Sequence, residues 1–294
     1  MGLLALFWGS SFLWIKMGLA SFTPVQMTFI RLVLGASVLV ALCWGGRRGL
    51  PRDRRLWGHL AVAALIGNAI PFTLFGVGQQ TVDSGVAGVI NATTPLWVLL
   101  IAIVLRSERN LSATKIGGLV LGFLGTLLIF SPWEAEIAGW GALLILVAAV
   151  CYAISFAYIG RFVSGRGVGP IALSASQILA ATGLMALALP VAGFTPIHLR
   201  WDAAIAVVVL GIFGTGFAFA LNYRLITDEG PTNAATVGYL LPVVSVLLGA
   251  LFLGEALTPH VLVGMAVVLG GVALTRVRRR RIPAPPPVVA VSRP

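Results

Sequence analysis

Two cationic side chains stand inside apolar stretches of the chain, and they are the first candidates for chemistry. Lys16 and Arg31 fall in neighbouring apolar stretches, near the ends that a short loop joins. Such a pair could attract an anionic group, for example a carboxylate, because charges inside apolar helices are costly and usually functional. The alternatives are structural: a lysine side chain can extend to the polar surface, and Arg31 could bond helix-end carbonyls or Glu255.

Neutral polar and aromatic side chains form a second group of candidates. Tyr152, Ser155 and Tyr158 recur at intervals of three, which places them on roughly one face of a helix. Each such residue alone more often bonds a neighbouring helix, but together they favour a polar cavity for a zwitterionic or amphipathic small molecule. With the two cations, the predicted substrate-binding set is Ser11, Trp14, Lys16, Arg31, Asn68, Asn91, Thr94, Trp97, Tyr152, Ser155, Tyr158, Gln177 and Tyr239.

Three prolines interrupt the same apolar stretches. Proline within a helix removes one backbone hydrogen bond and clashes with the preceding turn. We therefore expect kinks at Pro71, Pro95 and Pro242 that free carbonyls toward a cavity and act as hinges. A kink that only fits the packing is the alternative.

Acidic and histidine side chains are absent from the centres of the apolar stretches. The carboxylates, which lie in loops or at helix ends, are Asp53, Asp83, Glu108, Glu134, Glu136, Asp202, Asp228, Glu229 and Glu255. An intramembrane enzyme would need clustered acid, base or metal-binding groups, so we expect neither an enzyme nor a cofactor. Cys43 and Cys151 lie in apolar stretches as well, which argues against a disulfide framework or a metal site.

The composition of the 294-residue chain is that of a membrane protein. Apolar residues make up 59% and charged residues 10% of the sequence, and the mean hydropathy is +1.00. Soluble proteins carry roughly 25% charged residues, so a soluble globular domain is excluded. Helices that cross a bilayer need about 20 apolar residues. The apolar stretches predict ten of them, at residues 3–21, 25–45, 57–78, 84–105, 114–131, 137–160, 170–192, 202–223, 231–253 and 258–275.

The positive charge follows the loops between these helices. The formal net charge is +11, but it does not indicate a nucleic-acid partner, because the basic residues lie in short loops. Successive loops face alternate sides of the membrane. Apart from Lys16 and Arg31, which lie within the helices, every basic residue except Arg200 falls in a loop or terminus of the same side. Cytoplasmic loops carry this excess. We therefore expect a multi-pass protein of a bacterial inner (plasma) membrane with both termini in the cytoplasm.

Two halves of the chain repeat one pattern. Pro95 lies thirteen residues before Glu108, and Pro242 lies thirteen before Glu255. Pro24 likewise precedes Arg31 by seven residues, as Pro170 precedes Gln177. Five helices per half is an odd number, so the halves are expected to enter the membrane in opposite directions, as in transporters whose substrate site lies between inverted repeats. The predicted units are a first repeat at 1–131, a second at 137–275, and a basic, Pro-rich cytoplasmic tail at 276–294 that is expected to be disordered.

These motifs resemble a known family. The stretch Phe7-Trp8-Gly9-Ser10-Ser11-Phe12, the position of Arg31, and the doubled Pro…Glu pattern are similar to those of EamA-type members of the drug/metabolite transporter superfamily. The resemblance covers residues from about Leu3 to Thr275. It implies an all-α membrane protein of ten helices in two inverted five-helix repeats, with the first four helices of each repeat around a central cavity. It also implies export of amino acids or other small metabolites.

The leading hypothesis is therefore an alternating-access exporter of small organic metabolites, with amino acids as the first candidates. Small multidrug-resistance relatives of the family carry a glutamate in their first helix, whereas the first helix of this chain contains Lys16. Export of hydrophobic cations through binding to such a glutamate is therefore disfavoured. Facilitated efflux fits the lack of a carboxylate inside the helices. The alternatives are a carrier or exchanger of another polar metabolite, such as a nucleotide sugar, or a passive channel, which the absence of repeated charge rings weakens. The expected partners are a small-molecule substrate and membrane lipids, for a monomer or a homodimer.

Overall fold

The computed structural model describes residues 1–82, 84–105, 112–130, 139–192, 195–253 and 259–276, and within these ranges it contains helices and no strand. The α-helices are α1 (Gly2–Gly9), α2 (Ser11–Gly18), α3 (Pro24–Gly45), α4 (Arg54–Ala64), α5 (Ile70–Gly78), α6 (Ser84–Asn91), α7 (Thr94–Val104), α8 (Ala113–Phe130), α9 (Trp140–Tyr158), α10 (Pro170–Ala192), α11 (Trp201–Gly211), α12 (Ala218–Glu229), α13 (Pro231–Ala235), α14 (Val237–Leu253) and α15 (Pro259–Arg276). In the same ranges, three π-helical turns join or extend them: η1 (Leu65–Ala69), η3 (Ile159–Val163) and η4 (Ile212–Phe217). The expectation of an all-helical fold is confirmed.

Many of these helices are long and apolar enough to cross a membrane. Within the described residues, six continuous helical segments meet this requirement: Pro24–Gly45, Arg54–Gly78, Val86–Val104, Trp140–Val163, Pro170–Pro190 and Trp201–Glu229. Shorter apolar segments cover Gly2–Gly18, Ala113–Ile129 and Pro259–Thr275. A continuous helix satisfies its own backbone groups, which is why helices of this kind are stable in lipid. The chain is a multi-pass membrane protein.

The start of α3 shows how local sequence places a functional residue. The Thr23 hydroxyl accepts a hydrogen bond from the Gln26 backbone N–H at 3.3 Å, and the Gln26 side chain accepts one from the Thr23 N–H at 3.0 Å. This is a capping box, and Pro24 fits the first helical position because its missing N–H would be unpaired there anyway. The helix is thereby fixed at its start, and Arg31 follows two turns later.

The predicted kink sites have different local structures. Pro71 stands in the first turn of α5, directly after η1, and Pro95 stands in the first turn of α7, after the interruption that separates α6 from α7. Pro242 lies inside α14, whereas the break that separates α13 from α14 falls earlier, at Thr236. Whether these prolines act as hinges stays a prediction. Glu108, Glu255 and the tail from residue 277 lie outside the described residues.

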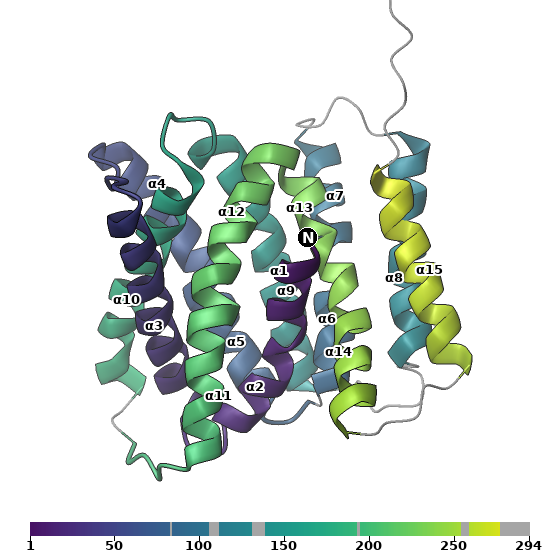
Figure 1. Cartoon of the computed structure of the whole chain (residues 1–294), viewed down its shortest axis with the longest axis horizontal. Helices are drawn as coiled ribbons and strands as arrows, with labels where there is room; N and C mark the ends of the chain where they lie inside the picture. Colours follow the sequence, from purple (N-terminus) through teal and green to yellow (C-terminus); the bar gives the residue numbers. More distant parts are fainter. Residues whose placement is uncertain (83, 106–111, 131–138, 193–194, 254–258, 277–294) are drawn as a thin grey trace, which may run out of the picture.

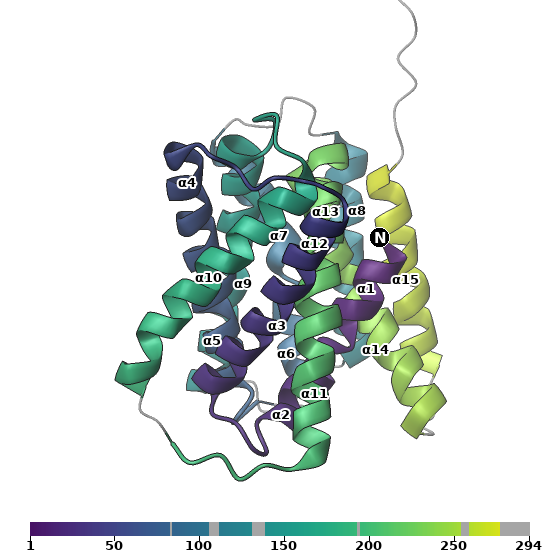
Figure 2. The same ribbon diagram turned by 60° about the vertical axis from the view of Figure 1, so that its left-hand side comes forward.

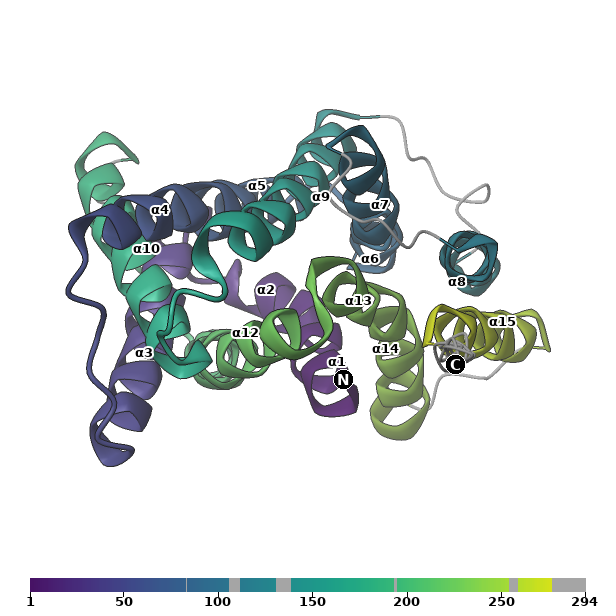
Figure 3. The same cartoon turned by 90° about the horizontal axis from the view of Figure 1, so that it is seen from above.

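The helices form one bundle with a separate pair at its edge (Figure 1). Helix α3 lies against α10, and α5 and α7 both pack on α9 (Figure 2). Seen from above, α8 and α15 lie side by side at one edge, next to α14 (Figure 3). Glycines make this pairing close, because a Cβ on Gly118 would lie 2.7 Å from the Gly271 carbonyl oxygen and one on Gly125 2.9 Å from that of Gly264. As the residue numbers rise in α8 they fall in α15, so the two helices are antiparallel.

Candidate functional site

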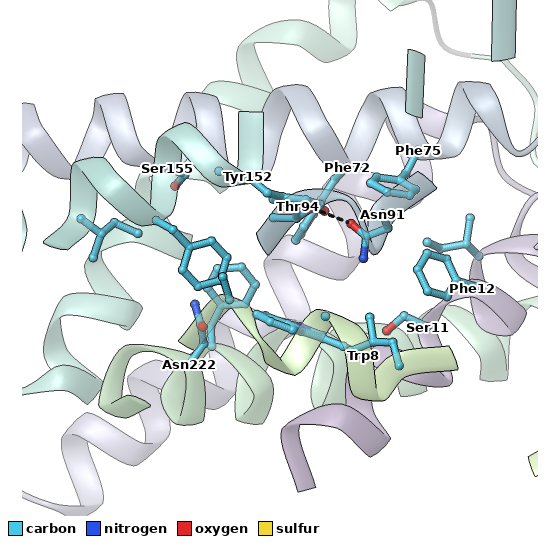
Figure 4. Close-up of a pocket in the computed structure, with 18 of the residues that line it drawn as sticks. Trp8, Ser11, Phe12, Phe72, Phe75, Asn91, Thr94, Tyr152, Ser155 and Asn222 are labelled. Carbon is cyan, nitrogen blue, oxygen red and sulfur yellow. Dashed lines mark hydrogen bonds between the residues drawn. The ribbon is translucent and has the colours of Figure 1, made fainter. Parts of the chain in front are cut away.

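A cavity lies between the helices of the main bundle. Its volume is about 100 Å³, and a water molecule needs roughly 10–15 Å³ of such space, so it has room for several waters or a small solute. None of the described residues of α8 or α15 lines it. The lining residues, many of them drawn in Figure 4, are Trp8, Ser11, Phe12, Ile15, Arg31, Gly67, Phe72, Phe75, Asn91, Thr94, Tyr152, Ser155, Phe156, Ile159, Gln177, Phe219, Asn222, Ala235, Gly238 and Leu241.

Arg31 brings the cavity its charge. The side chain is 4% exposed, and within the described part of the chain no other lining residue is ionised at neutral pH. Its Nε donates a hydrogen bond to Thr215 Oγ1 in η4 at 3.1 Å, and its Cζ lies 3.8 Å from the centroid of the Phe72 ring. No carboxylate among the described residues forms an ion pair with it. Among the described residues, a hydroxyl and an aromatic face thus hold the guanidinium in place, and none of them is a counter-ion.

Gln177 occupies the corresponding place on α10, but its amide is fully engaged. Its Nε2 donates to Asn68 Oδ1 in η1 at 2.6 Å and to the Ala63 carbonyl at 3.4 Å. Its Oε1 accepts a hydrogen bond from the buried Tyr223 hydroxyl. Asn68 is thus a partner of Gln177 and does not line the cavity itself. This network joins three helical segments and leaves Gln177 little capacity to bind a solute.

Other predicted residues reach the cavity as well. Ser11, Asn91, Thr94, Tyr152 and Ser155 all line it. The Ser11 hydroxyl donates to its own helix, at the Phe7 carbonyl, whereas Thr94 donates to Asn91 Oδ1 at 3.5 Å across the break that separates α6 from α7 (Figure 4). Small neutral groups of this kind can rotate toward a bound molecule without leaving an ionised group exposed to lipid.

The remaining predicted residues lie elsewhere. Lys16 is exposed and its Nζ lies 3.4 Å from the Gln79 carbonyl oxygen. Tyr158 hydrogen-bonds His59 Nδ1 at 2.8 Å. Trp14 packs beside α11 residues, Trp97 Nε1 donates to Thr93 Oγ1 at 3.1 Å, and Tyr239 is buried in the cluster that includes residues of α8 and α15. The structure therefore gathers only part of the predicted set around the cavity.

The sequence reasoning missed most of the aromatic lining and one amide. Trp8 Nε1 donates to the Gly214 carbonyl at 3.2 Å, which orients its ring edge-on to Phe219 with 6.0 Å between centroids. Phe72 lies 6.1 Å from Phe219 in another edge-to-face pair. Asn222 is the missed amide, and it is 4% exposed. It falls at the end of the predicted apolar range 202–223, where a polar residue is ordinary, so its position is only a weak signal.

Comparison with known proteins decides the family. The sequence pattern described as "EamA: EamA-like transporter family" matches residues 1–131 and again residues 139–277. The chain belongs to this family. EamA proteins are members of the drug/metabolite transporter superfamily, so the expectation drawn from the motifs is confirmed, and a role in transport, as opposed to enzymatic catalysis, agrees with the relatives' names.

Relatives of this EamA protein come from distant organisms. The protein named "Uncharacterized inner membrane transporter YedA" from Escherichia coli K12 is 30% identical over 298 residues, which cover 98% of this chain and 93% of that protein. An "Uncharacterized transporter" from Archaeoglobus fulgidus is 26% identical, over 93% of this chain and 96% of its own. A solved crystal structure has the same fold, with a TM-score of 0.76 at 22% identity over 93% of this chain and 94% of that one.

Proposed function

We propose that this EamA protein is an alternating-access exporter of small organic carboxylates, with amino acids as the first candidates. The observation that carries the proposal is the buried Arg31 guanidinium at the cavity wall. A buried charge is costly unless it is paired, and Arg31 has a hydroxyl and an aromatic face as its partners. A substrate carboxylate would supply, through charge-assisted hydrogen bonds, the counter-ion that no described residue provides.

The composition of the cavity wall supports the two-repeat organisation. Except for Gly67 and Ala235, the lining residues form pairs with one member in each half of the chain. The pairs 144 residues apart are Trp8 and Tyr152, Ser11 and Ser155, Phe12 and Phe156, and Ile15 and Ile159. Arg31 and Gln177 are 146 apart, and the pairs 147 apart are Phe72 and Phe219, Phe75 and Asn222, Asn91 and Gly238, and Thr94 and Leu241. Equal contributions from both halves fit ten crossings in two inverted repeats that expose one central site to each side in turn.

The membrane orientation follows from charge. The described basic residues Arg47, Arg54, Lys115, Arg161 and Arg224 all belong to the loops and helix ends of one side, which we assign to the cytoplasm. Both termini then lie in the cytoplasm. A bacterial inner membrane fits the name of the Escherichia coli relative. The described residues of the cavity wall include no carboxylate that could carry a proton during transport. Efflux down the concentration gradient of the substrate is therefore the simplest energetic scheme.

The test is counterflow of labelled amino acids in vesicles that contain the purified protein. We expect saturable uptake that unlabelled amino acid inside the vesicles accelerates, which is the signature of a carrier. Arg31→Gln is a mild change, because glutamine already occupies the corresponding position 177. It should lower apparent affinity roughly tenfold or more, as loss of a hydrogen bond to a charged group does.

Two comparisons make this result specific. Arg31→Lys retains the charge and should recover part of the affinity, whereas Arg224→Gln, which removes an exposed arginine paired with Asp228, should transport as the wild type does. Normal transport by Arg31→Gln would overturn the assignment of the carboxylate site. Flux that does not saturate would favour a channel instead.

A further inference from the structure

Asn222 presents an unsatisfied amide at the cavity. The side chain is 4% exposed, and its Oδ1 has no hydrogen-bond partner within the described part of the chain. Figure 4 shows the amide extending from α12 toward the aromatic side chains of the cavity. A buried polar group without a partner costs about 1–3 kcal/mol. A ligand in the cavity that forms a hydrogen bond with this group would remove that cost.

The amide distinguishes one half of the cavity from the other. Phe75 stands at the corresponding position of the first half, so packing at that place requires no polar group. Gln177 is the other amide of the second half that lines the cavity, and its side chain is already hydrogen-bonded to Asn68, Ala63 and Tyr223. Asn222 is therefore the amide of that half whose capacity is open to a bound molecule.

Asn222 lies well away from Arg31. Arg31 Nε is fixed to Thr215, and Asn222 follows Thr215 by seven residues along the η4–α12 segment. At 1.5 Å per residue this is about 10 Å along the helix axis. The rings of Phe72 and Phe219 occupy the interval, because Arg31 stacks on the first and the two rings are in edge-to-face contact. The wall thus offers a cation, an aromatic middle section and an amide.

We propose that Asn222 selects substrates whose end remote from the carboxylate carries a neutral hydrogen-bonding group, such as an amide or a hydroxyl. This inference rests on the proposed function, in which Arg31 binds the carboxylate. The carbon skeleton of the substrate lies against Phe72, Phe219 and Trp8. The α-amino group of an amino acid is bonded to the same carbon as the carboxylate and therefore stays near Arg31, so the selectivity at Asn222 concerns the side chain of the substrate.

The experiment measures inhibition constants in the vesicle assay for two pairs of similar shape. L-glutamine is compared with L-methionine, and L-asparagine with L-leucine. The wild type should favour the amide-bearing member of each pair. Asn222→Leu should weaken binding of glutamine and asparagine roughly five- to tenfold, the effect of one lost hydrogen bond, and leave methionine and leucine unchanged or improved.

A second variant keeps the inference testable if the leucine variant folds poorly. Asn222→Asp keeps the size of the side chain and adds a negative charge, so it should shift preference toward L-lysine and L-ornithine, whose remote ends are cationic. The matched control is Asn233→Leu, on α13 and outside the cavity, where the amide donates to the Glu229 carbonyl at 3.0 Å. It should keep the wild-type order of affinities.

The outcomes separate the two proposals. If the wild type transports these amino acids but neither Asn222 variant changes the order of affinities, the role of Asn222 is overturned and the carboxylate site at Arg31 stands. If the wild type transports carboxylates without preferring a polar remote end, the role of Asn222 is likewise overturned. If the wild type transports none of the carboxylates, the proposed function fails, and the role of Asn222 fails with it.

Discussion

Arg31 illustrates how one buried charge can be maintained for function. A guanidinium is costly in an apolar wall, and Thr215 Oγ1 and the Phe72 ring lower that cost, while no carboxylate of the described residues pairs with the charge. Thr215 also donates its own proton to the Leu210 carbonyl at 3.1 Å, so its oxygen is oriented to accept from Arg31. In the proposed carboxylate site, Thr215 is thus a positioning residue that orients the Arg31 guanidinium.

Thr215→Val tests this role with little change in shape. The variant removes the acceptor of the Arg31 Nε–H, and we expect apparent KM for amino acids to rise several-fold while maximal flux and thermal stability change little. The control is Thr227→Val in α12, whose hydroxyl donates to the Tyr223 carbonyl at 2.8 Å and which is not among the lining residues of the cavity. Equal KM values for Thr215→Val and the wild type would show that Arg31 needs no such support.

Which residues line the cavity could be predicted only in part. Residue type identified Arg31, Tyr152 and Gln177, because polar groups in apolar helices are conspicuous. Asn222 was missed because it falls at the end of the predicted range 202–223, where polar residues are ordinary, whereas α12 continues to Glu229 and buries it. Trp14 and Tyr158 lie outside the lining, since helical spacing selects a face without showing which neighbour that face meets.

The π-helical turns η1 and η4 each carry a side chain that accepts a hydrogen bond from the other half of the chain. Asn68 in η1 accepts from Gln177 of the second half, and Thr215 in η4 accepts from Arg31 of the first half. The two acceptors are 147 residues apart, so the contacts are equivalent in the repeat. π-helical turns inside α-helices often mark functional sites. The backbone at these turns also allows neighbouring helices to approach closely, as Gly67 does with Ser155.

Gly67→Ala should disturb this contact. The added Cβ would lie 3.0 Å from Ser155 Cβ and closer still to its Oγ, so η1 and α9 must move apart. Overpacking of this kind costs about 1–3 kcal/mol, and we expect a lower midpoint of thermal unfolding in detergent together with reduced transport. Removing the oxygen in the double variant Gly67→Ala/Ser155→Ala should recover part of the loss. Gly183→Ala, where nothing lies within 4 Å, is the control, and equal midpoints for the two single variants would contradict the contact.

Helix positions were predictable where hydropathy alone determines them. The apolar ranges 25–45 and 170–192 match α3 and α10 closely. The interruptions at Ser10 and at Ala92–Thr93 and the turns η1, η3 and η4 were not predicted. The reason is physical: polarity indicates which residues prefer lipid, but it does not distinguish backbone bonds to the fourth preceding carbonyl from bonds to the fifth.

In the described part of the chain, the whole molecule consists of a bundle that contains the cavity and a peripheral pair of helices, α8 and α15. The cavity is enclosed by the main bundle, and α8 and α15 pack on each other through glycines at its edge. Their contact with the rest of the structure includes α14. Changes in this pair should therefore affect stability more than substrate selection.

Gly125→Ala tests that separation. Its Cβ would lie 2.7 Å from the Val268 backbone nitrogen, so the two helices must separate. We expect a lower midpoint of thermal unfolding, with affinities for amino acids in the folded fraction unchanged. Gly117→Ala, whose nearest neighbour would be 3.9 Å away, should behave as the wild type does. A change of affinity in Gly125→Ala without loss of stability would place the pair within the transport machinery.

The opposite insertion of the two repeats is the central claim, and labelling from each side of the membrane tests it most directly. Ser112 precedes α8 and Pro259 begins α15, at positions 147 residues apart. After replacement of Cys43 and Cys151, single cysteines at these two positions would be treated in cells with a maleimide that cannot cross the membrane. We expect Pro259→Cys to react from outside, and Ser112→Cys to react only after the membrane is opened. Reaction of both cysteines from the same side would contradict that claim.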